Sequence, residues 1–420
     1  MKRRTALQLG LTGLAGLLTS AWAARSSALV PLQPTRRFLF VVNRGGWDPL
    51  NVLTPLFGQP QIAMPVLAEP ATVAGIPLVL SPSRPSVTRF FEQWGARSLV
   101  LHGLSVRSVS HEVCEFTMMT GRASGDGTDH ATRLAQLGEN AALPHLVLSG
   151  PSYPGPLSSL VARSGVSGQL QELISGDVRL RSDQPTPGLS APATRIVNDF
   201  VARRTRAARD ARPGPRRAAL DAALSRSERL QDLRYDVSFS SDGSLGSQLD
   251  IALALLSRGL AHCVTVSPPA FWDTHTDSDN QQGPLWESLF AGLNGFFSKA
   301  AATPVRGPDG APTDRNVLDD TVVVVLSEMA RTPQLNADLG RDHWPWTSAL
   351  IAGDGVTGGR AVGGYDQGYR GLGVDPASGE VDVQRPAPTP AQLGATLLAL
   401  AGMDPGVFGP GVEPLLGVLG

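Results

Sequence analysis

Six short apolar runs, each followed by a polar segment, constrain the fold of this chain more than any other feature of its sequence. The runs are largely apolar along their whole length rather than alternating, which is typical of strands buried on both faces of a sheet. Helix-like stretches lie between them, at 86–94, 248–260, 285–300 and 391–400. This order predicts an α/β three-layer sandwich with a mostly parallel central sheet. The predicted strands are Phe38–Val42, Ser98–His102, Leu146–Leu148, Cys263–Val266, Val322–Leu326 and Ala349–Ala352.

The first residues have the layout of an export signal. Lys2, Arg3 and Arg4 are basic, residues 9–18 are uncharged, and Ala21-Trp22-Ala23 forms a small-x-small cleavage site. The paired arginines favour the twin-arginine export machinery as a partner, with an ordinary secretion signal as the alternative. We therefore expect a signal peptide at 1–23, a single domain at 24–420, and a mature protein in the periplasm or outside the cell.

Composition argues against several classes of partner. The formal net charge is −1, so no overall field indicates binding to nucleic acid or to an anionic membrane. After residue 23 no run reaches the ~20 apolar residues that span a bilayer, so we do not expect this chain to be an integral membrane protein. Because the chain has only two cysteines, Cys114 and Cys263, a disulfide framework is excluded, whereas a single bridge between them is left open.

The region 203–234 differs from the rest because it is rich in Arg and Ala, with Pro213-Gly214-Pro215 near its middle. We expect a helical hairpin on the surface near 195–235. In this interpretation Ala and Leu pack inward and the charged face is solvated, which we favour over an anion-binding patch.

Titratable residues gather just beyond the carboxyl ends of four predicted strands, where open α/β sheets bind their ligands. Their oxygen and imidazole groups suit zinc, manganese, magnesium or calcium. Asp273 and His275, one residue apart, point the same way on an extended segment. A single loop Asp more often forms a turn and a single His a hydrogen bond, so the hypothesis rests on the set. The candidate metal ligands are Asp48, Asp273, His275, Glu328, Asp342 and His343.

Several segments, in the same order along the chain, resemble the motifs of domain of unknown function 1501, a branch of the alkaline phosphatase and sulfatase superfamily. The resemblance implies an alkaline-phosphatase-like fold in which Asp48, at the end of the first strand, is a metal ligand. Residues 110–122 are similar to the sulfatase nucleophile helix, which also ends in Thr-Gly-Arg, and this puts the nucleophile position at Ser110 or His111. The segments are Arg44–Asn51, Ser110-His111, Asp273-Thr274-His275, Ser327–Thr332 and Gly340–Pro345.

Two features differ from the active members of that superfamily. Met329 stands where they carry His or Asn as a ligand, and a thioether is a poor ligand for hard dications. The spacing from Asp273 to His275 is also shorter than the Asp-x-x-x-His of alkaline phosphatases. We therefore expect a one-metal or altered site rather than the full two-metal site.

The candidate catalytic residues are Ser110, His111, Arg44 and Arg331. A dication activates a coordinated hydroxyl and stabilises charge on phosphoryl or sulfuryl oxygens. Ser110 would attack from the N-terminus of a helix, and His111 would transfer protons to the leaving group. Arg44 or Arg331 would bind the oxygens of the transferred group. The expected activity is metal-dependent hydrolysis of a small anionic ester of phosphate or sulfate.

Two other functions stay open. A binding or scaffold protein can retain this fold with a degenerate site. A serine hydrolase is a weaker alternative, because the chain lacks a G-x-S-x-G elbow and the adjacent Ser110 and His111 are badly placed to bond to each other. Residues 353–358 match G-x-G-x-x-G, but no helix is expected after them, so we expect a glycine-rich loop near the mouth of the site.

Overall fold

The computed structural model describes residues 36–124, 126–165, 179–181, 184–185, 190–211, 214, 217, 220–221, 242–307 and 310–420. The expected signal peptide at 1–23 lies outside these residues, as does most of the second arm of the expected hairpin near 195–235. Among the described residues, no helix has both the length and the apolar character needed to cross a membrane.

An eight-stranded sheet forms the centre of the molecule, in the order β16-β4-β15-β12-β1-β9-β5-β6. Seven strands are parallel, and β15 runs antiparallel to its neighbours β12 and β4. All six predicted strands lie in this sheet, whereas the three-residue edge strands β6 and β16 were not predicted. The strands are β1 (Arg37–Asn43), β4 (Ser98–Ser105), β5 (Leu143–Val147), β6 (Val161–Arg163), β9 (Ala261–Val266), β12 (Thr321–Ser327), β15 (Trp346–Gly353) and β16 (Arg360–Val362).

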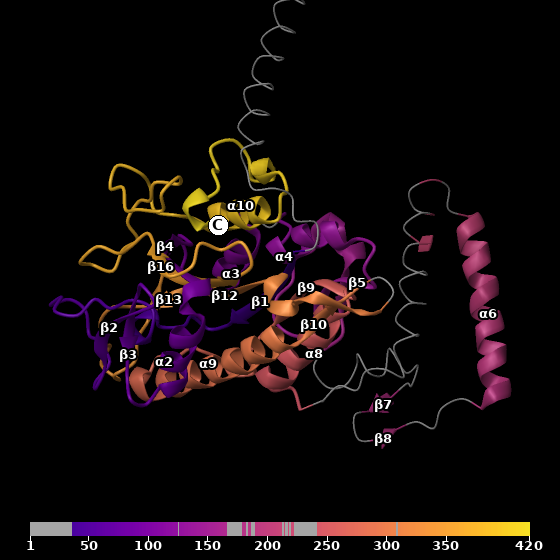
Figure 1. The fold of residues 1–420 in the computed structure, drawn as a ribbon, viewed down its shortest axis with the longest axis horizontal. Helices are drawn as coiled ribbons and strands as arrows, with labels where there is room; N and C mark the ends of the chain where they lie inside the picture. Colours follow the sequence, from indigo (N-terminus) through magenta and orange to yellow (C-terminus); the bar gives the residue numbers. More distant parts are fainter. Residues whose placement is uncertain are drawn as a thin grey trace, which may run out of the picture.

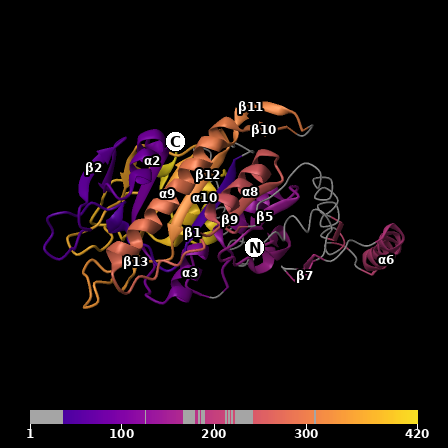
Figure 2. The same cartoon turned by 90° about the horizontal axis from the view of Figure 1, so that it is seen from below.

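Helices cover both faces of the sheet (Figures 1 and 2). On β1, Leu39 and Val41 pack into the core on the side of α2, α8 and α9, while Phe38 and Phe40 pack into the core beneath α3, α4 and α10. All four side chains are fully buried, which explains why the run is apolar without alternation. The predicted three-layer α/β class is thus confirmed. These helices are α2 (Pro85–Trp94), α3 (His111–Thr120), α4 (His130–Leu134), α8 (Leu245–Ser257), α9 (Ser278–Ala302) and α10 (Pro390–Leu400).

Besides short 3-10 helical turns, the described elements also include four small two-stranded sheets and one further α-helix. Of these, the hairpin of β13 (Ala330–Arg331) and β14 (His343–Trp344) belongs to the candidate site, and the helix α6 (Ala191–Asp210) is treated below. The remaining strands are β2 (Glu69–Val73), β3 (Ile76–Leu80), β7 (Arg179–Arg181), β8 (Gln184–Pro185), β10 (Pro304–Arg306) and β11 (Pro312–Asn316).

The antiparallel direction of β15 decides which loops lie at the site. Since β15 runs opposite to β12, it begins at the edge where the parallel strands end, and β14 therefore also lies at that edge. The glycine-rich loop 353–358 follows β15 at the other edge, where the Asp354 N–H donates to the carbonyl of Thr321, the first residue of β12. The expectation that this loop lies near the site mouth is wrong. The two cysteines, Cys114 and Cys263, are free and buried.

Three buried histidines predict acid sensitivity. Burial lowers the pKa of His102, His130 and His262 to about 4, from an ordinary value of about 6.5. The unfolded chain therefore takes up protons below about pH 6.5 that the folded chain takes up only near pH 4, so stability falls across this window. The expected loss is on the order of 1 kcal/mol per histidine per pH unit. Calorimetry should show Tm falling between about pH 6.5 and 5, and a constant Tm there would contradict this.

Candidate metal centre

A tight turn after β1 brings two chain segments together. Gly45 and Gly46 both have positive φ, of 108° and 76°, and the Gly45 N–H donates to Glu328 Oε1 at 2.7 Å. A Cβ atom on Gly45 would lie 2.6 Å from the backbone nitrogen of Trp272 and 2.7 Å from that of Asp273. The missing side chain therefore lets the loop after β9 approach the end of β1, and this sets the position of Asp273.

Gly45→Ala is expected to destabilise the fold by about 2–4 kcal/mol, because it adds a backbone clash to a strained φ. Gly58→Ala is the matched control, since Gly58 has a φ of +77° but no atom within 4 Å of the added Cβ. Chemical denaturation of both variants separates the two effects. Equal losses of stability would show that the contact with the loop after β9 has no part in the cost.

Glu328, directly after β12, orients a histidine. Its side chain is 3% exposed, and Oε1 lies 2.8 Å from His111 Nδ1 while Oε2 accepts from the Ser327 hydroxyl at 3.0 Å. The hydrogen bond to Glu328 raises the pKa of His111 against the opposing effect of burial. A carboxylate that holds one ring nitrogen and leaves the other free to bind is the usual outer partner of a metal-ligating histidine. Glu328, which was predicted as a direct metal ligand, therefore contacts His111 Nδ1 and orients the ring instead.

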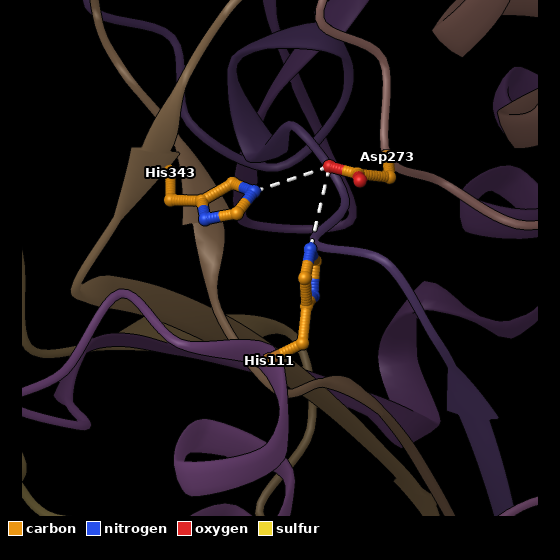
Figure 3. Close-up of side chains that lie close together, drawn as sticks. All are labelled: His111, Asp273 and His343. Atoms are coloured by element: carbon orange, nitrogen blue, oxygen red, sulfur yellow. Dashed lines mark hydrogen bonds and ion pairs between the residues drawn. The ribbon is translucent and has the colours of Figure 1, made fainter.

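Two histidines and one carboxylate converge at the carboxyl edge of the sheet (Figure 3). His111 Nε2 is buried, makes no hydrogen bond and lies 3.4 Å from Asp273 Oδ1. His343 Nε2 lies 3.2 Å from the same oxygen, while its Nδ1 lies 2.7 Å from the carbonyl oxygen of Val109. Each ring therefore uses Nδ1 to bind the protein and presents Nε2 to Asp273.

His275 repeats this arrangement on the solvent side. Its Nδ1 lies 3.0 Å from Asp342 Oδ1, and its Nε2 lies 3.0 Å from Asp273 Oδ1 and 3.1 Å from His343 Nε2. Asp342, which is 61% exposed, contacts His275 and holds its ring rather than joining the inner group.

Arg331 keeps Asp273 ionised. The guanidinium has no exposed surface and donates to the carbonyl oxygens of Gly45, Gly46 and Arg341 and to Asp273 Oδ1. Burial acts to raise the pKa of Asp273, but the hydrogen bond and charge of Arg331 outweigh it and hold the pKa at about 2. The predicted role of Arg331, binding the oxygens of a substrate, does not fit a guanidinium that the protein itself encloses. We assign it to positioning Asp273.

Arg44 and Ser110 lie at the exposed side of the centre. Arg44 Nε pairs with Glu115 Oε2 at 2.6 Å, and its side chain is 49% exposed. Together with Phe271, whose ring lies 5.7 Å from that of His111, Arg44 borders a cleft of about 210 Å³. Ser110 is exposed at the N-cap position of α3 but makes no capping hydrogen bond. Both residues are therefore accessible to a molecule that approaches His111.

Asp48 lies outside this group, in a separate buried cluster. Its oxygens accept from the Leu50 N–H at 3.1 Å and from Asn51 Nδ2 at 3.0 Å, and Arg341 Nε lies 3.0 Å from Oδ2. Burial raises the pKa of Asp48, and the charge of Arg341 opposes this. The Gly45-Gly46 turn redirects the chain, so that Asp48 caps the short helical turn Pro49–Asn51. The structure does not bring this predicted ligand to the other candidates.

The inner group fits a tetrahedral ion. Ligands about 2.0–2.1 Å from a tetrahedral zinc ion lie about 3.3 Å from one another, and the separations of 3.2 and 3.4 Å from Asp273 Oδ1 to the two histidine nitrogens match this. Two imidazoles and one carboxylate suit zinc better than magnesium or calcium, which prefer oxygen ligands. The sequence predicted His111 only as a catalytic residue. No sequence pattern identifies the Val109 carbonyl as the group that contacts His343.

The sheet, its helical layers and the residues at its carboxyl edge define a three-layer α/β protein with a candidate metal centre. The chain belongs to the family described as "Protein of unknown function (DUF1501)", which matches residues 97–411. This confirms the family to which the sequence motifs pointed. A search of curated proteins finds no match.

Solved structures with a similar outline include members of the alkaline phosphatase superfamily. CgsB in complex with a neocarrahexaose has 9% identity and a TM-score of 0.41, with 88% of this chain and 72% of that chain covered. A protein of the alkaline phosphatase superfamily from Vibrio parahaemolyticus has 12% identity and a TM-score of 0.38, with 91% and 70% covered. A 2-O GAG sulfatase has 9% identity and a TM-score of 0.36, with 88% and 71% covered.

Proposed function

We propose that this chain is a metal-dependent hydrolase of phosphate or sulfate esters with a single-metal centre formed by His111, Asp273 and His343. The observation that carries the proposal is the convergence of two Nε2 atoms on one carboxylate oxygen, with each Nδ1 held by an oxygen of the protein. A bound dication would polarise the ester and lower the pKa of a nearby hydroxyl or water.

Ser110 and His275 are proposed to carry out nucleophilic attack and proton transfer. Ser110 supplies a hydroxyl beside the free N–H groups at the N-terminus of α3, where negative charge on a phosphoryl or sulfuryl group is stabilised. Attack by this oxygen forms an ester bond to Ser110 and breaks the bond to the leaving alcohol, which takes up a proton. Water then cleaves the Ser110 ester. His275, whose ring is 43% exposed and oriented by Asp342, is placed to transfer these protons between the site and solvent.

The division between ligand and proton carrier predicts different behaviour for two histidine variants. His343→Gln should lose bound zinc and activity together, because it removes a ligand. His275→Gln should keep the zinc but lower kcat by about 10²–10⁴-fold, the usual contribution of an acid–base group. Elemental analysis and initial rates with 4-nitrophenyl phosphate and 4-nitrophenyl sulfate check both. Loss of zinc in His275→Gln would contradict the assignment.

Specific observations also favour a second candidate, a binding protein that retains the fold and binds metal without turnover. Met329 is fully buried in the core, and the enclosed guanidinium of Arg331 occupies the space between the Gly45 turn and Asp273. No second metal is expected in that space. Stoichiometric zinc with no hydrolysis across phosphate and sulfate esters would favour this candidate over the hydrolase.

We also propose export through the twin-arginine route, on the basis of Arg3, Arg4 and the Ala21-Trp22-Ala23 site. Replacing both arginines with lysine should leave the chain inside the cell. N-terminal sequencing of the exported form should give a start near Ala24, and export of the lysine variant would favour the ordinary secretion route.

A further inference from the structure

The helix α6 carries an apolar stripe that the described part of the protein leaves exposed. Every residue from 195 through 204 is exposed, and Figure 1 shows the helix standing apart from the sheet and its layers. Four large apolar side chains contribute to the stripe: Ile196 is 69% exposed, Val197 44%, Phe200 56% and Val201 51%. At 100° per residue these four lie within one arc of about 140°, together with Ala193, Ala207 and Ala208. The hairpin expected near 195–235 stays a prediction, because most of its second arm lies outside the described residues.

The opposite side of α6 is strongly basic. The helix contains five arginines and two aspartates, Asp199 and Asp210, which gives it a formal charge of +3 in a chain whose total is −1. Arg195, Arg206 and Arg209 lie opposite the apolar stripe, with Arg209 in an ion pair with Asp221, and Arg203 lies at the border of the stripe. Arg204 alone lies within the stripe, and its long side chain can extend to a polar boundary.

Most of the stability of a helix in a protein comes from packing of its amphipathic face, and leaving Phe200 and Ile196 in solvent forgoes that burial. Ser190 caps the N-terminus through its side chain, so the start of the helix is encoded locally. The apolar stripe of α6 is the part of the helix that lacks burial, and an apolar partner would supply it.

We infer that α6 binds the surface of an anionic lipid bilayer, lying in the interface with Phe200 and Ile196 among the acyl chains and the arginines at the headgroups. A bilayer satisfies both properties at once, because it offers an apolar layer directly beneath negative charge. Nucleic acid would match the arginines but leave Phe200 in water. A second copy of α6 would cover the stripe but bring Arg204 of one helix against that of the other. The inference does not depend on the proposed ester chemistry.

The test is sedimentation of the purified chain with vesicles of phosphatidylcholine alone or of phosphatidylcholine mixed with phosphatidylglycerol. The wild-type chain should sediment with the mixed vesicles and not with the neutral ones, and added salt should weaken binding. The double variant Ile196→Ser, Phe200→Ser should lower the partition coefficient by at least about tenfold. Arg203→Gln and Arg206→Gln should each lower it roughly fivefold. Asn198→Ser, on the polar side of the same helix, is the matched control and should bind as wild type does.

Thermal unfolding of each variant should match the wild type, because the replaced side chains are exposed, and this excludes misfolding as the cause of lost binding. All variants carry the same N-terminal residues, so any binding through those residues cancels in the comparison. Absence of binding to anionic vesicles, or binding that the serine and glutamine variants leave unchanged, would overturn the inference. A dimer in light scattering that the double serine variant dissociates would also overturn it in favour of a second copy.

Discussion

Asp273→Asn is expected to abolish stoichiometric zinc binding, with a loss of affinity greater than the roughly 10–100-fold that removal of an outer partner causes. Asp273 Oδ1 is the atom on which His111, His275 and His343 converge, at 3.4, 3.0 and 3.2 Å. The asparagine keeps the shape of the side chain but removes its charge, which a divalent ion requires for tight binding. Activity toward any phosphate or sulfate ester should fall with the metal.

Three further variants separate the loss of a metal ligand from a general loss of structure. Asp342→Asn weakens the contacts to His275 Nδ1 and Asn336 but leaves the three proposed ligands in place, so we expect at most a tenfold loss of zinc affinity. Glu328→Gln disturbs the carboxylate behind His111 and should cost about 10–100-fold. Asp314→Asn, an exposed residue of β11, should have no effect. Isothermal titration of metal-free protein with zinc gives the affinities of the wild type and the four variants, and equal zinc binding by wild type and Asp273→Asn would exclude the centre.

Asp48→Ala is expected to destabilise the protein by about 3–5 kcal/mol, because it leaves the guanidinium of Arg341 buried without its partner. Both side chains have no exposed surface, and they lie 3.0 Å apart. The double variant Asp48→Ala, Arg341→Leu should recover a large part of this loss, since it removes both charges. Asp250→Ala, which breaks the exposed pair with Lys299, should cost less than about 1 kcal/mol.

Metal content distinguishes this structural role of Asp48 from the ligand role that the sequence motif implied. Well below its Tm, Asp48→Ala should still bind one equivalent of zinc, because its carboxylate contacts Leu50, Asn51 and Arg341 rather than the histidines. Denaturant titration followed by fluorescence gives the stability, and elemental analysis of the folded variant gives the metal. Loss of zinc without loss of stability would restore Asp48 as a ligand.

The layers of the fold were predictable because a strand buried on both faces leaves a continuous apolar run in the sequence. Phe38 to Val42 shows this directly, since its residues alternate between two separate cores. The reversed direction of β15 left no such signal, because its residues are as apolar as those of the parallel strands. The three-residue strands β6 and β16 are too short to produce a pattern.

The edge of the sheet that carries the site was also predictable, because polar residues follow the strand ends. Which of them meet was not, since it depends on the direction of each loop. Asp48 follows β1 as closely as Asp273 follows β9, yet the two positive-φ glycines turn the chain so that only Asp273 reaches the centre. The burial of Arg331 beneath that turn is a consequence of packing that spacing along the chain does not encode.

Anomalous scattering from a zinc-soaked crystal would show whether one metal ion binds between His111, Asp273 and His343. We expect one strong peak at the zinc edge, about 2.0–2.1 Å from His111 Nε2, His343 Nε2 and a carboxylate oxygen of Asp273. A crystal with no peak at this position, or with its peak beside Asp48, would exclude this metal centre.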